Sequence, residues 1–203
     1  MNEITDVRET MSSIARSTSD QLHREEYLTV MLFASLWPKY SGRILGTTGL
    51  TLDTLQRRIQ GTPADELRKE HLPKTKDFYP DLLITAPLDG HDLISTLSID
   101  AVLGATQITH IYEFKYLTSF PTLPRKIARE DTYKLKVIGE YIHQETGTLP
   151  HMEQFIVASE REKAQRKNVD ALMRWFDDDE LKAKTTGVVI SIVGTDGKIH
   201  SGR

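Results

Sequence analysis

The sequence predicts an α/β domain with the element order α-β-β-β-α-β, a mixed central sheet flanked by helices, and a further helix and strand at the C-terminus. Three observations predict it. Apolar residues recur with a helical period between about residues 20 and 37. Three strand-like runs then follow one another across glycine-containing turns. After them, helical and strand-like segments alternate, which is typical of parallel strands joined by helices.

The first helix has a clear start signal. Ser19 or Asp20 is a suitable N-cap, and the helical period stops before Pro38, a residue that disfavours a helix interior. The apolar positions that carry the period are Leu22, Tyr27, Leu28, Met31, Leu32 and Leu36.

Residues 41–80 are expected to form a helical insertion. The segment 41–49 is rich in glycine and is expected to be a loop. Residues 52–59 and the stretch that begins at Thr62-Pro63 predict two short helices, because proline is favoured at the first helical position.

The strand candidates at 81–88, 93–103 and 108–117 are rich in Ile, Leu, Thr and Tyr, and the short turns between them predict an antiparallel meander. The remaining elements are expected in the order helix, strand, helix, strand, at 125–144, 154–159, 169–184 and 187–193.

Length and composition favour a single domain of residues 1–203, with a net charge of −3. That charge excludes a globally basic nucleic-acid coat, so any DNA contact is expected to be local. The absence of cysteine excludes disulfide scaffolds and thiolate zinc sites and is consistent with a reducing, cytoplasmic location. Residues 1–20 lack the apolar core of a signal peptide, and the longest apolar stretch, 27–37, is too short to cross a membrane.

The most informative motif is Glu113-Phe114-Lys115. Side chains alternate on a strand, so Glu113 and Lys115 are expected on one face and Phe114 on the other. Charges among apolar residues are costly unless they are paired or ligated, and a divalent ion would account for the acid. Two other acid-x-Lys triplets, at 180–182 and 196–198, fall in an expected helix and an expected glycine turn, so they are disfavoured.

A second acid is expected opposite Glu113. Asp100 lies 13 residues before it, a spacing that suits two arms of one hairpin. Asp81, in Pro80-Asp81, is the alternative, but a whole expected strand separates it from Glu113, so Asp100 is favoured.

With these residues on consecutive strands behind a helix, the chain resembles the PD-(D/E)xK nuclease superfamily, whose core is restriction-endonuclease-like. The resemblance implies a phosphodiesterase that depends on Mg²⁺, with Mn²⁺ as a possible substitute. It implies that Asp100, Glu113 and the Phe114 carbonyl bind the metal and that Lys115 positions or activates the attacking water. A further acid is implied from the first helix; Glu25 and Glu26 are both available, and Glu26 is favoured.

The helix after the triplet is expected to contact DNA phosphates through a local cluster in an otherwise acidic chain. Its candidate residues are Arg125, Lys126, Arg129, Tyr133 and Lys134. The histidine spacing does not predict a zinc site, and no glycine-rich phosphate loop predicts a nucleotide cofactor.

The sequence therefore favours a Mg²⁺-dependent DNA endonuclease of the restriction, resolvase or phage-defence type. RNA remains open as a substrate, and a homodimer is a reasonable hypothesis, since cutting two strands often pairs two sites. One alternative is a catalytically inactive nuclease fold that serves as a DNA-binding or assembly module. The other is an unrelated α/β protein in which Glu113 and Lys115 form surface ion pairs.

Overall fold

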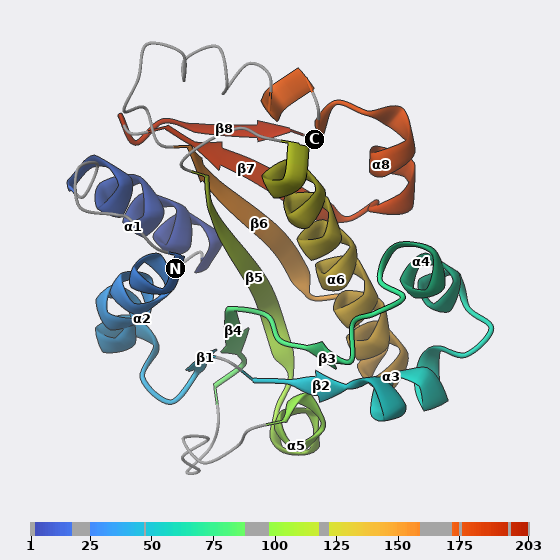
Figure 1. The fold of residues 1–203 in the computed structure, drawn as a ribbon. Coiled ribbons are helices and arrows are strands. Elements are labelled where there is room, and N and C mark those ends of the chain that lie inside the picture. Colours follow the sequence, from blue (N-terminus) through green and yellow to red (C-terminus); the bar gives the residue numbers. More distant parts are fainter. Residues whose placement is uncertain are drawn as a thin grey trace.

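The computed structural model contains a six-stranded mixed sheet with helices on both faces (Figure 1). It describes residues 3–17, 25–46, 48–87, 98–117, 122–158, 172–174, 176–194 and 196–202. The helices are α1 (Glu3–Ser17), α2 (Glu25–Tyr40), α3 (Leu52–Ile59), α4 (Pro63–His71), α5 (Ile99–Ala105), α6 (Thr122–Thr146) and α8 (Asp179–Lys184). The strands are β1 (Ile44–Gly46), β2 (Leu50–Thr51), β3 (Asp77–Phe78), β4 (Leu82–Thr85), β5 (Ile108–Leu117), β6 (His151–Ala158), β7 (Val188–Val193) and β8 (Ile199–Gly202).

The main sheet has the strand order β1-β4-β5-β6-β7-β8. Strands β1, β4 and β5 pair antiparallel, β5 pairs parallel with β6 and β6 with β7, and β8 returns antiparallel to β7. Helix α6 makes the crossover between the parallel strands β5 and β6, as such a connection requires. The predicted α/β class, with a mixed sheet flanked by helices, is confirmed.

The expected strand at 93–103 is wrong. Residues 99–105 form helix α5 instead, and residues 93–97 lie outside the described part of the chain. Ser98 caps this helix, because its side-chain oxygen accepts a hydrogen bond of 3.2 Å from the amide of Ala101. The apolar content of the segment was compatible with either state, and the cap favours the helix.

The first strand of the sheet comes from a segment that was expected to be a loop. Residues 44–46 form β1 and pair with β4, which makes β4 the second strand of the meander and β5 the third. Two of the three predicted strands are therefore present as β4 and β5, whereas β1 was expected to be a loop and α5 separates β4 from β5. This shift decides which acid faces Glu113.

The ends of several other elements also differ from the expectation. Helix α1 had no counterpart among the predicted elements, and α2 continues through Pro38 to Tyr40. The hydroxyl of Tyr40 donates a hydrogen bond of 2.7 Å to Asp6 of α1, a tertiary contact that holds the last turn of α2. The two insertion helices are confirmed as α3 and α4, and a last strand, β8, follows the glycine turn at Gly197.

Two hydrophobic layers lie on opposite faces of the sheet. Helices α1 and α2 cover one face, where Tyr112 and Phe114 of β5 are buried (Figure 1). Helix α6, together with α3, α4 and α5, covers the other face over Ile111 of the same strand. The predicted alternation along β5 is confirmed, so Glu113 and Lys115 point toward α6. None of the helices in the described part of the chain is long and apolar enough to span a membrane.

Candidate active site

Asp81 lies immediately before β4, at the position opposite Glu113. Leu82 pairs with Tyr112 in the antiparallel register, so the preceding residue faces Glu113. The backbone of Asp81 donates a hydrogen bond of 3.1 Å to the carbonyl of Tyr112. Its carboxylate accepts one of 2.7 Å from the amide of Phe114. Asp81 is therefore fixed to the middle of the Glu113-Phe114-Lys115 triplet.

A chain of alternating charges connects β5 to α6. Glu113 is only 3 % exposed, and the Nζ atom of Lys134 lies 2.5 Å from its Oε1 atom. The same Nζ atom lies 3.5 Å from Asp131, whose other oxygen is 3.0 Å from Lys115. Together with Asp81, three acids and two lysines are collected between the strand and the helix.

Helix α6 is held over the sheet by a buried amide beside this cluster. Gln154 of β6 is the parallel-register partner of Glu113 and is fully buried. Its amide nitrogen donates a hydrogen bond of 3.0 Å to the carbonyl of Ala128, and its oxygen accepts one from Thr132. Since both partners belong to α6, Gln154 fixes the position of α6 over the sheet, and with it the positions of Asp131 and Lys134 relative to β5.

The cluster changes the acid-base properties of its members. Burial raises the pKa of Glu113 well above its usual range; Lys134 opposes this shift, whereas Asp81 and Asp131 add to it. Burial alone would lower the pKa of Lys134, but the carboxylates of Glu113 and Asp131 outweigh that effect and raise it. Lys134 is accordingly the cation of the pair.

Two carboxylate oxygens of the cluster are buried without a hydrogen bond from the described residues, and one of them, Asp131 Oδ2, is ion-paired with Lys115. The Oε2 atom of Glu113 is buried and accepts no hydrogen bond from the residues that the structure describes. Such a group costs free energy unless an ion or a water completes it. Within the described ranges, no group of three or more acidic or histidine side chains is arranged to hold a metal ion, and two ammonium groups are interleaved with the carboxylates.

Asp100 is not part of this cluster, which corrects the expectation that it faces Glu113. It is exposed on α5, and its carboxylate accepts a hydrogen bond from the hydroxyl of Tyr141. It borders a polar groove of about 700 Å³ with Arg57 and Glu145, between α3, α5 and the C-terminal half of α6. Its predicted position depended on a strand conformation at residues 99–103, which belong to α5 instead.

Glu26 is placed only by its backbone. It belongs to the first turn of α2, but the side chains of Glu25 and Glu26 lie outside the described part of the chain. Helix α2 covers the face of the sheet opposite to α6. The choice between the two acids stays a prediction.

The residues expected to contact DNA separate into different environments. Lys126 is 73 % exposed, and Arg129 forms an ion pair of 3.1 Å with Asp178. Tyr133 is only 5 % exposed and stacks on His71 with ring centroids 4.0 Å apart, so little of its ring is left to contact DNA as expected. Lys134 points inward to Glu113, and the side chain of Arg125 is outside the described residues.

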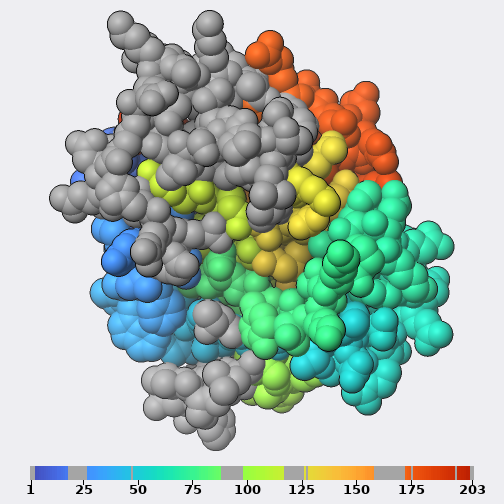
Figure 2. Space-filling model, viewed as in Figure 1, coloured from blue at the N-terminus to red at the C-terminus, as the bar shows by residue number. Residues whose placement is uncertain are grey.

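A groove of about 550 Å³ runs between α6 and the segment that joins α4 to β3. Lys74, Lys126, Arg129 and Tyr133 line it, together with acidic side chains from three elements. In the space-filling view, α6 (yellow) reaches the surface between the green segment that includes α4 and the orange segment that includes α8 (Figure 2). Arg129 and Tyr133, which line this groove, lie on α6, the helix that also carries Asp131 and Lys134 of the charged cluster.

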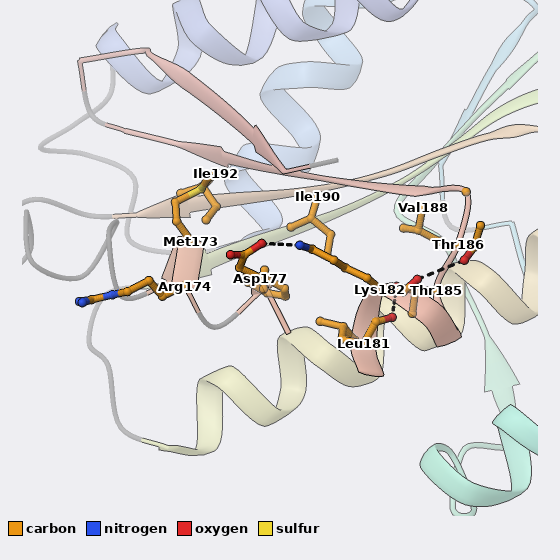
Figure 3. A pocket seen from close by; sticks show the side chains of 12 residues that line it. Met173, Arg174, Asp177, Leu181, Lys182, Thr185, Thr186, Val188, Ile190 and Ile192 are labelled. Atoms are coloured by element: carbon orange, nitrogen blue, oxygen red, sulfur yellow. Dashed lines mark hydrogen bonds and ion pairs between the residues drawn. The ribbon is translucent and has the colours of Figure 1, made fainter. Parts of the chain in front are cut away.

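A third pocket, of about 490 Å³, lies between α8 and the face of β7 (Figure 3). Leu181, Val188 and Ile190 line it, and Lys182 reaches across toward Asp177, with which it forms an ion pair. No residue of the charged cluster lines this pocket, and its lining is mainly apolar. The cluster between β5 and α6 is the stronger candidate for chemistry.

Comparison with known proteins gives no relative: no family model, no curated protein and no solved structure matches the chain. The geometry of the cluster is therefore the basis for a proposal of function. Sequence reasoning underrated Asp81 and did not consider Gln154. The signal for Asp81 was the pair Pro80-Asp81 ahead of an expected strand, and the signal for Gln154 was a single amide side chain in a mainly apolar strand.

Proposed function

We propose that the protein is a Mg²⁺-dependent endonuclease that hydrolyses phosphodiester bonds of DNA, with Mn²⁺ able to substitute. The observation that carries the proposal is the position of Asp81, opposite Glu113 and hydrogen-bonded to the amide between Glu113 and Lys115. A buried acid with a second, partly buried acid beside it is costly for stability alone, which favours a functional reason for the pair.

The residues of the cluster fit a divalent cation. Asp81, Glu113 and the Phe114 carbonyl would hold it, and the unpartnered Oε2 atom of Glu113 is an available oxygen ligand. Asp81 replaces Asp100 in this ligand set. When bound, the ion supplies Lewis-acid catalysis and a more acidic bound water. Mg²⁺ commonly uses one or two carboxylates together with phosphate oxygens, so the cluster has enough ligands.

The lysines and α6 would orient the substrate. Lys115 shares the strand face of Glu113, and its ion pair of 3.0 Å with Asp131 fixes its ammonium group beside the acids. An ammonium in that position can contact a phosphate oxygen or the attacking water. Lys126, which is exposed in the neighbouring groove, would bind the backbone of the same DNA.

The test is cleavage of plasmid, linear, single-stranded and branched DNA by the purified protein with Mg²⁺, Mn²⁺ or EDTA. We expect metal-dependent cutting, and we expect Asp81→Asn and Lys115→Ala to lower its rate by more than about a hundredfold, since even indirect partners of a metal contribute about 10–100-fold. Asp100→Asn is the matched control, because it removes an acid with a hydrogen bond elsewhere in the fold.

The outcomes separate the candidate functions. Loss of cutting in Asp81→Asn with full activity in Asp100→Asn supports the proposed site. Loss of cutting in Asp100→Asn with full activity in Asp81→Asn would instead assign the metal site to Asp100. No cutting of DNA or RNA by the folded, metal-supplied protein would favour the inactive nuclease fold that only binds DNA. Sedimentation in the same buffers tests the homodimer, whose two sites would cut both strands.

A further inference from the structure

Lys134 is the strongest cationic neighbour of Glu113. Its Nζ atom lies 2.5 Å from Glu113 Oε1, whereas Lys115, on the same strand as Glu113, is paired with Asp131. A carboxylate as deeply buried as Glu113 is very costly without a cation, so Lys134 stabilises the acid in the protein described here. The sequence alone had assigned this lysine to DNA.

The Lys134 ammonium and a divalent cation would compete for the same acid. An ammonium that is hydrogen-bonded to one carboxylate oxygen repels a metal ion on the other oxygen, and the repulsion is strong where water is excluded. Mg²⁺ also requires near-ideal octahedral geometry, which a crowded carboxylate restricts. Full occupation of the metal site therefore requires the ammonium to withdraw from Glu113.

The structure contains a place for the withdrawn ammonium. Asp131 lies one helical turn before Lys134, and one of its oxygens is already 3.5 Å from the Lys134 Nζ atom. A change of rotamer in a flexible four-carbon side chain is enough to exchange Glu113 for Asp131. The backbone of α6 stays in place because Gln154 is hydrogen-bonded to Ala128 and Thr132.

We propose that Lys134 is the counter-ion of Glu113 in the metal-free protein and that its ammonium group moves from Glu113 to Asp131 when the metal binds. This inference rests on the proposed metal site. In this proposal Lys134 is a positioning residue that sets the metal affinity. It stabilises the metal-free protein and thereby weakens metal binding.

The test measures Mn²⁺ binding to the full chain by titration calorimetry, together with thermal unfolding with and without Mn²⁺. We expect Lys134→Met to lower the melting temperature without metal and to tighten Mn²⁺ binding by at least about tenfold, which corresponds to about 1.4 kcal/mol. Its stabilisation by Mn²⁺ should increase accordingly. Lys134→Gln retains a hydrogen-bond donor without the charge and serves if the methionine variant does not fold.

Lys136→Met is the matched control. Lys136 lies on the same helix, is 15 % exposed like Lys134, and also forms an ion pair, of 2.6 Å with Glu140. It should leave Mn²⁺ affinity unchanged. A comparable tightening in Lys136→Met would mean a general effect of charge and would overturn the proposal.

Two further outcomes separate this inference from the proposed function. If Glu113→Gln abolishes Mn²⁺ binding while the Lys134 variants bind with unchanged or weaker affinity, the metal site is supported and the counter-ion role is wrong. If neither the parent protein nor the Lys134 variants bind Mn²⁺, the metal site and the counter-ion role are both wrong. Binding that appears only in the Lys134 variants would support both.

Discussion

Two buried glutamates lie on neighbouring strands and opposite faces of the sheet, and their surroundings differ. Glu113 of β5 faces α6, and Glu153 of β6 faces α1. The Oε1 atom of Glu153 accepts hydrogen bonds from Arg8, at 2.9 Å, and from Ser191, at 2.6 Å, and its Oε2 atom lies 3.0 Å from a ring nitrogen of His151. Both oxygens of Glu153 therefore have partners.

Glu113 has a cation on one oxygen and no hydrogen bond on the other from the residues described. A complete network around a buried acid makes the fold rigid, whereas an incomplete one costs free energy and is retained where an activity requires it. The comparison indicates that Glu153 connects α1 to β6 and β7, and the unpartnered oxygen of Glu113 is consistent with the role proposed for it.

Exchanging each acid for its amide should separate these two roles and gives the largest effect. Glu113→Gln should lower metal-dependent cleavage by more than about a hundredfold and should lower the free energy of unfolding by less than Glu153→Gln, because Lys134 still has Asp131 as a partner. Glu153→Gln should lower that free energy by about 2 kcal/mol, because Arg8 and His151 lose a charged partner, and should retain cleavage below its melting temperature. Urea unfolding and cleavage rates of both variants check this, and the opposite pattern would contradict the comparison.

Removing the cation of the Glu153 network should change stability alone and leave cleavage unchanged. Arg8→Ala leaves Glu153 with His151 and Ser191, and we expect the free energy of unfolding to fall by about 2 kcal/mol, less than for a wholly buried pair because Arg8 is partly exposed. Urea unfolding measures it. Arg16→Ala, an exposed arginine of the same helix, is the control and should change stability by less than about 0.5 kcal/mol. Equal losses would indicate that the Glu153 network does not hold α1.

The remaining effect concerns the pH dependence of stability on the Glu153 face. Burial lowers the pKa of His110 from its ordinary value of 6.5 to about 4; His151 and Arg43 act in the same direction, and Glu3 and Glu153 oppose it. The His110 imidazole binds a proton more readily in the unfolded chain than in the folded protein. The contribution of neutral His110 to stability is therefore fully present above about pH 6.5 and is lost as the pH falls toward 4. His110→Gln should make the free energy of unfolding less dependent on pH between these values. Urea unfolding at several pH values measures the difference, and an unchanged slope would contradict it.

Local sequence pattern predicted the elements with strong periodicity. Strand β5 has the predicted bounds 108–117, and α6, β6 and β7 lie close to theirs, because each carries an uninterrupted pattern of apolar residues. The shared face of Glu113 and Lys115 also followed from strand alternation alone. Helix α1 was not predicted, although its buried Val7, Met11 and Ile14 have helical spacing.

The acid opposite Glu113 shows why the remaining features of the site could not be predicted from the sequence. Asp100 had the better spacing to Glu113 along the chain, but the serine cap turned its segment into α5, and the short strand β1 took the first place in the meander. A strand of three residues carries too little pattern to be recognised without its partner. Asp81 became the partner of Glu113 only through the register between β4 and β5.

The sequence by itself determined the α/β class, the charged triplet on β5 and the helix that follows it, because these depend on periodicities within one segment. The tertiary structure decided that Asp81 faces Glu113, that Lys134 points inward and that Glu153 anchors α1. Each of these depends on which segments become neighbours and at what register. That is set by the packing of the whole chain, since a slip of one residue would turn every side chain of a strand to the other face.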